Sequence, residues 1–311
     1  MSSITFPRLF MIPARVLMLL TLLFFASCSF FNRDEEEEAG AGMAEQEIYQ
    51  TAQRAIEANS FMRAITYLQA LESQFPFGDY AEQAQLDIIY AQYRASDHEA
   101  ALASADRFIR LHPEHPNVDY AYYMRGLINF TRETSFVGNF VPVDLTTRDP
   151  GTARESFANF SELLSRFPNS TYAPDARKRL IYIRNMLARQ EIMVANYYFR
   201  RGAYLAATNR GQYVVENFQG SPAVPDGLAV MAQGYTLLGY HEQAQNAVKV
   251  LAHNYPDHPA LNPDGTFRYQ DMEGGIKRSW LNRLTMGMLD RPDELGFDTR
   301  ELYNPQYQQP N

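Results

Sequence analysis

One pattern recurs five times along the chain and limits the folds that it can adopt: a small residue is followed, eleven positions later, by Phe, Tyr or His, usually before proline. Small residues allow two helices to approach closely, and proline ends a helix. Helical signals continue from residue 45 to 255 without sustained alternation of period two. The pattern therefore predicts an all-α chain of helix pairs. The pairs of residues are Ala64 with Phe75, Ala101 with His112, Ser156 with Phe167, Ala207 with Phe218, and Ala244 with Tyr255.

Further positions fall into the same register. An apolar residue stands seven positions after each small one, and in three units another small residue stands twelve positions before it. This unit resembles the tetratricopeptide repeat, a helix-turn-helix of about 34 residues with a late alanine and a closing proline. We therefore expect an α-solenoid of five tetratricopeptide-like helix pairs. The apolar residues are Leu71, Phe108, Leu163, Val214 and Leu251, and the earlier small residues are Ala52, Ala195 and Ala232.

Two insertions lengthen the regular spacing of 37 residues to 55 and then 51. The first falls between Asn129 and Ser156 and contains Gly138, Pro142 and Pro150, which predicts a loop in repeat 3. The second has no helix breaker and adds 14 residues, close to four helical turns. It predicts one long helix from about Thr171 to Arg200, the first helix of repeat 4, which divides repeats 1–3 from repeats 4–5.

The N-terminal residues have the pattern of a secretory signal. Arg8 and Arg15 precede an apolar run from Val16 to Phe25, and the only cysteine, Cys28, follows at once. Ten apolar residues span about 15 Å, half of a bilayer core, which favours a cleaved signal over a membrane-spanning helix. The segment resembles a bacterial lipoprotein signal. Residues 1–27 are then the signal peptide, and Cys28 carries N-palmitoyl and S-diacylglycerol groups; the alternative is a free cysteine after an unrelated signal.

The remaining domain boundaries follow from composition. Residues 28–43 are rich in Glu, Ala and Gly and predict a lipidated, flexible acidic tether. Residues 44–255 hold the five repeats, and residues 256–311 form a C-terminal extension. Within the extension, Gly275 to Leu289 has the pattern of one short amphipathic helix, which either caps the last repeat or contacts a partner or membrane. Residues 290–311 are expected to be disordered or to lie along a surface.

Composition excludes several classes of function. The chain has 28 basic and 36 acidic residues, so no nucleic-acid partner is expected. A single cysteine excludes a disulfide scaffold and a cysteine-based zinc site. His112 and His115 lie in one turn and His253 and His258 in another, where proline explains the local sequence without a metal. The sequence contains none of the motifs of hydrolases or nucleotide-binding proteins. We expect no enzyme activity, no metal and no cofactor beyond the lipid on Cys28.

Several short strings resemble the BamD family, the tetratricopeptide lipoproteins of the β-barrel assembly (BAM) machinery in Gram-negative outer membranes. The resemblance covers about residues 45 to 255, including the loop insertion and the long helix. The strings are residues 47–49 and 52–53, 75–78 and 85–87, 106–111, 115–117 and 119–120, 123–126, Arg148-Asp149-Pro150, and 178–180.

The resemblance implies a non-enzymatic subunit that is lipid-anchored to the outer membrane and faces the periplasm. Implied partners are a POTRA domain of the barrel protein BamA, the lipoproteins BamC and BamE, and unfolded β-barrel proteins. The family's C-terminal repeats bind the POTRA domain through an arginine, which corresponds to Arg210 here. A different class of function also remains open, that of a tetratricopeptide lipoprotein adaptor for cell-wall (peptidoglycan) enzymes.

The resemblance further implies that the N-terminal repeats receive substrate or partner segments. We place that surface near Phe77, Tyr80 and Tyr93, with further candidates on the neighbouring repeats. For each residue an internal packing role competes with direct contact. In particular, the two arginines could pair with Asp106 or Glu114 instead of with an acidic peptide. The further candidates are Arg107, Arg110 and Tyr123.

Overall fold

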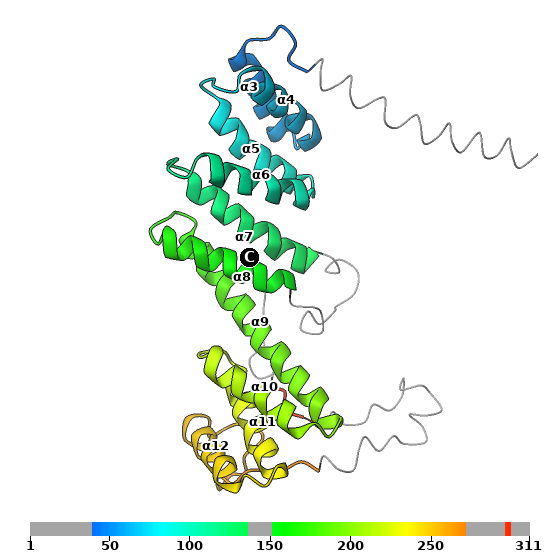
Figure 1. The fold of residues 1–311 in the computed structure, drawn as a ribbon, viewed down its shortest axis with the longest axis vertical. Helices are drawn as coiled ribbons and strands as arrows, with labels where there is room; N and C mark the ends of the chain where they lie inside the picture. Colours follow the sequence, from blue (N-terminus) through cyan, green and yellow to red (C-terminus); the bar gives the residue numbers. More distant parts are fainter. Residues whose placement is uncertain (1–38, 136–150, 272–295, 300–311) are drawn as a thin grey trace, which may run out of the picture. The chain divides into compact units, whose positions relative to one another are not determined.

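The computed structural model describes residues 39–135, 151–271 and 296–299, and within these ranges the chain forms ten α-helices (Figure 1). The predicted all-α, helical-repeat fold class is confirmed. In chain order the helices are α3 (Glu45–Glu57), α4 (Phe61–Gln74), α5 (Ala81–Arg94), α6 (His98–Leu111), α7 (Val118–Ser135), α8 (Gly151–Arg166), α9 (Ala173–Arg200), α10 (Tyr204–Asn217), α11 (Val224–Leu237) and α12 (His241–Asn254).

The chain divides into two compact units, residues 1–124 and 125–311. In the first unit α3 packs on α4, α4 on α5 and α5 on α6; in the second, consecutive packing runs from α8 to α12. The boundary falls inside α7, so the long helix α9 lies within the second unit. The sequence instead predicted that α9 would divide repeats 1–3 from repeats 4–5. In the structure α9 packs on α8, α10 and α11, and these helices all belong to the second unit.

The recurring small and apolar residues form the helix contacts. The three earlier small residues and the five apolar residues of the pattern are all fully buried. The small residues that open the pattern are buried too: Ala64, Ala101, Ser156 and Ala207 have no exposed surface, and Ala244 is 2% exposed. A small side chain at a helix crossing brings the backbones close together, and the apolar residue two turns later fills the space beyond it. The second helices also end where the sequence predicts. Phe75, His112, Phe218 and Tyr255 are the residues that follow α4, α6, α10 and α12.

The long helix is present as one uninterrupted element. Helix α9 contains 28 residues, which corresponds to about 42 Å. Pro174 lies in its first turn, where a missing N–H costs no internal hydrogen bond, and Asp175 lies there too, where a negative charge favours the positive end of the helix dipole. The prediction of a single helix is therefore confirmed, with a start two residues later than expected.

The predicted tether ends earlier than residue 43. Residues 39–43 form turns, and the Gln74 side chain donates a hydrogen bond to the carbonyl of Ala39 (3.2 Å). Gly40 is buried at a φ of 77°, and a Cβ there would lie 2.8 Å from the Ile48 side chain. Glycine is therefore required at this close approach, and the described end of the acidic segment packs on the first helix pair instead of extending into solvent.

The C-terminal extension packs partly into the core of the second unit. Residues 256–271 form turns closed by an antiparallel bridge between Leu261 and Phe267. In residues 296–299, Phe297 is only 4% exposed. The expectation of disorder or a surface position for residues 290–311 is wrong for this segment, because an isolated phenylalanine gives no periodic signal of burial.

Several predicted features lie outside the described residues. They are the signal peptide 1–27, the lipidation site Cys28, the loop residues 136–150 and the whole of the helix expected at 275–289. Among the helices that are described, none is both long and apolar enough to cross a membrane.

Candidate binding surfaces

Arg210 lies on α10 and is held by a buried carboxylate. Its Nη1 donates to Glu191 Oε2 on α9 at 2.8 Å; the Glu191 side chain is 6% exposed and that of Arg210 is 40% exposed. This hydrogen bond raises the pKa of Arg210 above its ordinary value. The guanidinium is therefore fixed at one side and accessible at the other, which suits an arginine that contacts a partner.

A second arginine shares the same carboxylate. Arg154 Nη2 on α8 lies 3.5 Å from Glu191 Oε1, and the Arg154 side chain is 60% exposed. Two arginines beside one buried glutamate leave a net positive charge, so this surface of the second unit favours an acidic partner.

Phe77 and Tyr80 occupy the turn between α4 and α5, but their environments differ. Phe77 is 99% exposed. Tyr80 stacks on Tyr49 with 4.6 Å between ring centroids, and its N–H donates to Glu45 Oε1 at 2.7 Å. Phe77 is thus available for contact, whereas Tyr80 helps to join α5 to α3.

The other substrate candidates in the first unit are spread over several helices. Tyr93 lies in the last turn of α5, so about 20 Å of helix separates it from Tyr80. Arg107 forms an ion pair with Glu72 on α4, so its internal partner is neither Asp106 nor Glu114. Arg110 is exposed on α6, and Tyr123 is half-buried on α7. These residues do not converge on one pocket. A partner that contacts both Tyr80 and Tyr93 would have to extend along α5.

Three side chains from the strings of the family resemblance do meet. Tyr49 Oη donates to Asp87 Oδ2 at 3.0 Å, and the Gln53 amide donates to the same oxygen at 2.5 Å. Gln83 donates to Asp87 Oδ1 at 2.9 Å. Burial raises the pKa of Asp87 despite these hydrogen bonds. This cluster joins α3 to α5. Tyr49, Gln53 and Asp87 belong to the strings of the family resemblance, whereas no sequence pattern pointed to Gln83.

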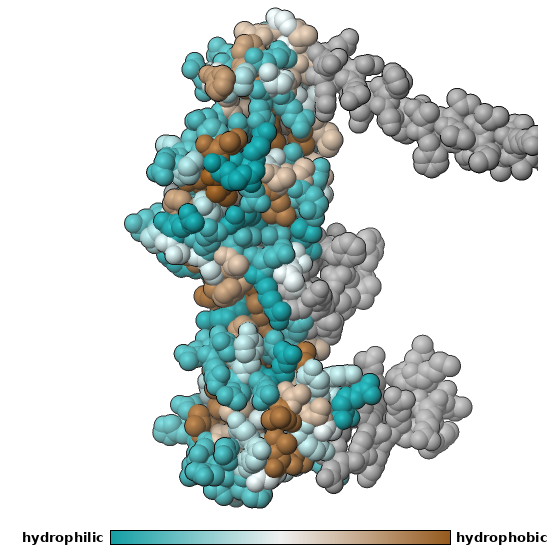
Figure 2. All heavy atoms as spheres, viewed as in Figure 1, coloured by the Kyte–Doolittle hydropathy of each residue, from teal (hydrophilic) through white to brown (hydrophobic). Residues whose placement is uncertain are grey.

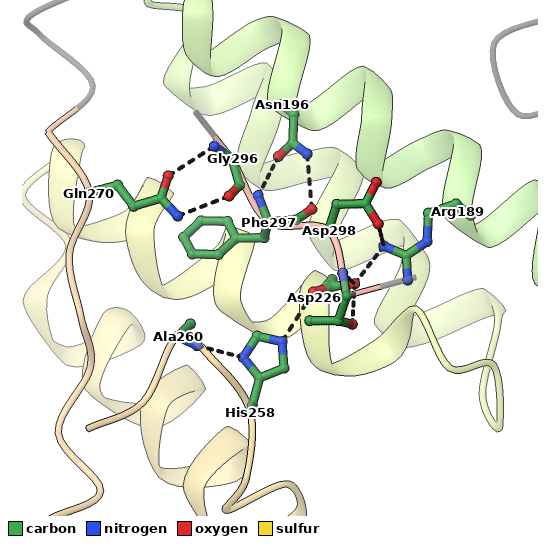
Figure 3. Close-up of polar contacts among 10 residues, drawn as sticks. Arg189, Asn196, Asp226, His258, Ala260, Gln270, Gly296, Phe297 and Asp298 are labelled. Atoms are coloured by element: carbon green, nitrogen blue, oxygen red, sulfur yellow. Dashed lines mark hydrogen bonds and ion pairs between the residues drawn. The ribbon is translucent and has the colours of Figure 1, made fainter. Parts of the chain in front are cut away.

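A second polar cluster is buried in the second unit, where neither Arg189 nor Asp226 is exposed (Figure 3). Arg189 Nη1 on α9 donates to Asp226 Oδ2 on α11 and lies 3.2 Å from Asp298 Oδ1. His258 Nε2 lies 3.1 Å from Asp226 Oδ1. Burial alone would raise the pKa of Asp226, but His258 and Arg189 outweigh it and hold that pKa below its ordinary value.

The same cluster fixes the tail segment, defined here as residues 296–299. Asn196 donates to the carbonyl of Phe297 (2.9 Å) and accepts from its N–H (3.0 Å), and Thr299 donates to Asp226 Oδ2 through its N–H and its hydroxyl. Gln270 makes the same two-way contact with Gly296, both bonds being 2.9 Å (Figure 3). These contacts were not predictable from the sequence, because Asn196 and Phe297 are 101 residues apart and no spacing rule connects them.

Repeated helix pairs define the class of the protein: an α-helical repeat protein, with accessible aromatic and arginine side chains on its surface. The surface in Figure 2 agrees, since apolar patches interrupt a mostly hydrophilic exterior. Within the described ranges, no group of three or more His, Cys, Asp or Glu side chains could hold a metal ion.

Comparison with known proteins gives the family. Residues 41–251 match the family model YfiO, described as an outer membrane lipoprotein. A Neisseria meningitidis protein named outer membrane protein assembly factor BamD is 39% identical over 228 residues, 73% of this chain and 85% of the relative. Proteins of the same name from Xylella fastidiosa and Vibrio cholerae are 38% and 36% identical, over 78% and 67% of this chain and 82% and 86% of their own lengths. The chain therefore belongs to the YfiO, or BamD, family of outer membrane lipoproteins.

Proposed function

We propose that the protein is a subunit of the BAM complex that helps β-barrel proteins to assemble and insert into the outer membrane. In this proposal the triacylated Cys28 anchors it to the outer membrane and the repeats face the periplasm. Each buried CH₂ of an acyl chain contributes about 0.8 kcal/mol, and more than one chain is needed for stable anchoring. The role is binding rather than catalysis. Family membership over residues 41–251 is the observation that carries the proposal.

Docking to a POTRA domain of BamA is assigned to Arg210. The support is local: Glu191 fixes the arginine, two-fifths of its side chain is exposed, and Arg154 adds positive charge beside it. A carboxylate on the partner could accept from the accessible N–H groups without displacing Glu191, since a guanidinium carries five donors.

Reception of unfolded barrel segments is assigned to the first unit. Phe77 is an exposed aromatic anchor of the kind that dominates binding surfaces, and Arg110 offers an exposed charge. BamC and BamE are the companion lipoproteins of the same proposal.

The test is an affinity pull-down of the full mature lipoprotein from detergent-solubilised membranes. We expect the wild type to recover a POTRA-bearing barrel protein, and Arg210→Ala to reduce its recovery at least about tenfold, because loss of a hydrogen-bonded interfacial charge costs 2–5 kcal/mol. Arg210→Lys keeps the charge without the planar fork and should give an intermediate result.

Arg166→Ala is the matched control, because Arg166 is another ion-paired and accessible arginine of the second unit, and its partner is Glu162 instead of Glu191. Retained recovery with Arg166→Ala and loss with Arg210→Ala would assign docking to Arg210. Equal recovery with all variants would remove Arg210 from the interface and leave the BAM proposal intact. Recovery of peptidoglycan enzymes with unchanged porin levels would favour the alternative, a tetratricopeptide adaptor for cell-wall enzymes.

A further inference from the structure

The tail segment lies on the second unit in the way that a peptide lies on a receptor. Its first two residues have both backbone groups bonded by amide side chains, Gly296 by Gln270 and Phe297 by Asn196 (Figure 3). Gln270 is itself fixed, because its own N–H and carbonyl are bonded by Gln233 of α11 (2.9 and 3.0 Å). Such contacts bind the backbone and do not depend on side-chain identity. The backbone bends at Gly296, whose φ of 136° lies in the region that favours glycine.

Selectivity comes from the side chains of the same segment. A Cβ at Gly296 would lie 2.3 Å from Asn196 Cγ, so only glycine fits there. Phe297 packs against Phe199 and Phe267, with ring centroids 6.4 and 5.9 Å away. The first two positions therefore accept glycine followed by an aromatic residue.

The last two positions are polar. Asp298 Oδ1 lies 3.2 Å from Arg189, and the Thr299 hydroxyl donates to Asp226 at 2.9 Å. Arg189 and Asp226 are fully buried, and His258 fixes the other oxygen of Asp226. This arrangement distinguishes a carboxylate from a hydroxyl at adjacent positions of the peptide.

The receptor residues come from the repeats and from the turn after them, not from the tail segment. Asn196 and Arg189 lie on α9, Gln233 and Asp226 on α11, and Gln270 on the 256–271 turn. Residues 272–295 separate this turn from Gly296 in the sequence, so the segment and the turn that binds it are not neighbours along the chain.

We propose that these residues form a peptide-binding site for a Gly-aromatic-Asp-Thr segment that bends at its glycine, and that residues 296–299 occupy it as a tethered competitor. The ligand class is a peptide of a partner protein with this pattern. Binding of that peptide displaces the tail segment. The proposal goes beyond BAM membership and does not involve Arg210.

The probe is a fluorescein-labelled synthetic peptide with the sequence of residues 294–301, Glu-Leu-Gly-Phe-Asp-Thr-Arg-Glu, followed by fluorescence anisotropy with the full mature chain in detergent. We expect Phe297→Ala protein, whose own tail is weakened, to bind the peptide at least about tenfold more tightly than the wild type, because a wild-type site occupied nine-tenths of the time loses that factor in apparent affinity. A peptide with alanine for its glycine is the matched control and should not bind.

A second variant tests the receptor side. Asn196→Asp is nearly isosteric but cannot donate to the peptide carbonyl, and combined with Phe297→Ala it should abolish binding while circular dichroism remains unchanged. Absence of peptide binding by folded Phe297→Ala protein would overturn the proposal, as would equal binding after Asn196→Asp. Global unfolding of the Phe297→Ala protein would also overturn it, since the segment would then be a fixed part of the core rather than an exchangeable ligand.

Discussion

Arg189 and Asp226 form an ion pair that has no exposed side-chain surface, and they are 37 residues apart, the spacing of the regular repeat. The pair joins α9 to α11, equivalent first helices of successive repeats. Removing both charges from water is costly, so the pair adds little to the free energy of unfolding compared with an apolar replacement. Loss of one partner alone is strongly destabilising, because it leaves a buried charge without its counter-charge.

Asp226→Asn is therefore expected to destabilise the protein by about 3 kcal/mol, because Arg189 loses its fully buried counter-charge and keeps only the partly exposed carboxylate of Asp298. Urea unfolding at neutral pH measures the effect. Arg166→Ala is the comparison, since it removes an exposed i,i+4 pair with Glu162 and should cost less than about 1 kcal/mol. Similar losses in the two variants would contradict the prediction.

Asp87 should give the opposite pH dependence to an ordinary carboxylate. Burial raises its pKa in the folded state, so from the unfolded value near 3.8 up to the raised pKa the folded chain binds more protons than the unfolded chain. The contribution of Asp87 is fully present below the lower value and is lost as pH rises through the raised one.

The free energy of unfolding of the wild type, relative to Asp87→Asn, should therefore increase as pH is lowered from 7 towards 4. Urea titrations at several pH values measure this difference. Asp264→Asn supplies a control of opposite sign, because hydrogen bonds from Thr266 lower the pKa of Asp264 and its contribution is lost as pH falls. A difference for Asp87→Asn that stays constant with pH would refute the expectation.

Gly211 lies at a close approach of the α10 and α11 backbones. A Cβ at this position would lie 2.7 Å from the carbonyl oxygen of Gly227, a backbone atom that cannot rotate away. Gly211→Ala should destabilise the protein by about 1–3 kcal/mol through overpacking, despite the better helix propensity of alanine. Thermal unfolding measures this, with Gln212→Ala in the same helix as a control; a gain in stability would show that the helices separate easily.

Substitutions of Phe77 and Tyr80 should have different effects in the first unit: the first should weaken binding, and the second should lower stability. Phe77→Ala removes an exposed ring and should change stability by less than about 0.5 kcal/mol. If the first unit receives barrel segments, Phe77→Ala should nevertheless weaken binding of an unfolded barrel protein. Tyr80→Ala should lower the melting temperature, because it removes the stack on Tyr49. Unchanged binding after Phe77→Ala would exclude this residue from the surface.

Contacts that follow the repeat were predictable from the sequence. Ala52, Ala64 and Leu71 share one register with their equivalents in later repeats, and their burial follows from the need to pack neighbouring helices. The absence of a helix breaker likewise allowed α9 to be predicted to within two residues at its start.

The polar contacts of the second unit were not predictable in the same way. His258 looked like one histidine of a turn, yet it contacts Asp226 of the preceding first helix. Asn196 binds a backbone 101 residues away. Neither contact changes a hydrophobic pattern, and a hydrogen bond to a backbone leaves no preference in the sequence of the segment that is bound.

The two-way amide contacts of Asn196 and Gln270 have a consequence for sequence variation within the family. Their hydrogen bonds tolerate any side chain, so only the steric limit at Gly296 and the aromatic contact at Phe297 restrict mutation at the first two positions. Among relatives that carry this extension, we expect glycine followed by an aromatic residue to persist together with Asn196, and all three to drift together where the extension is lost.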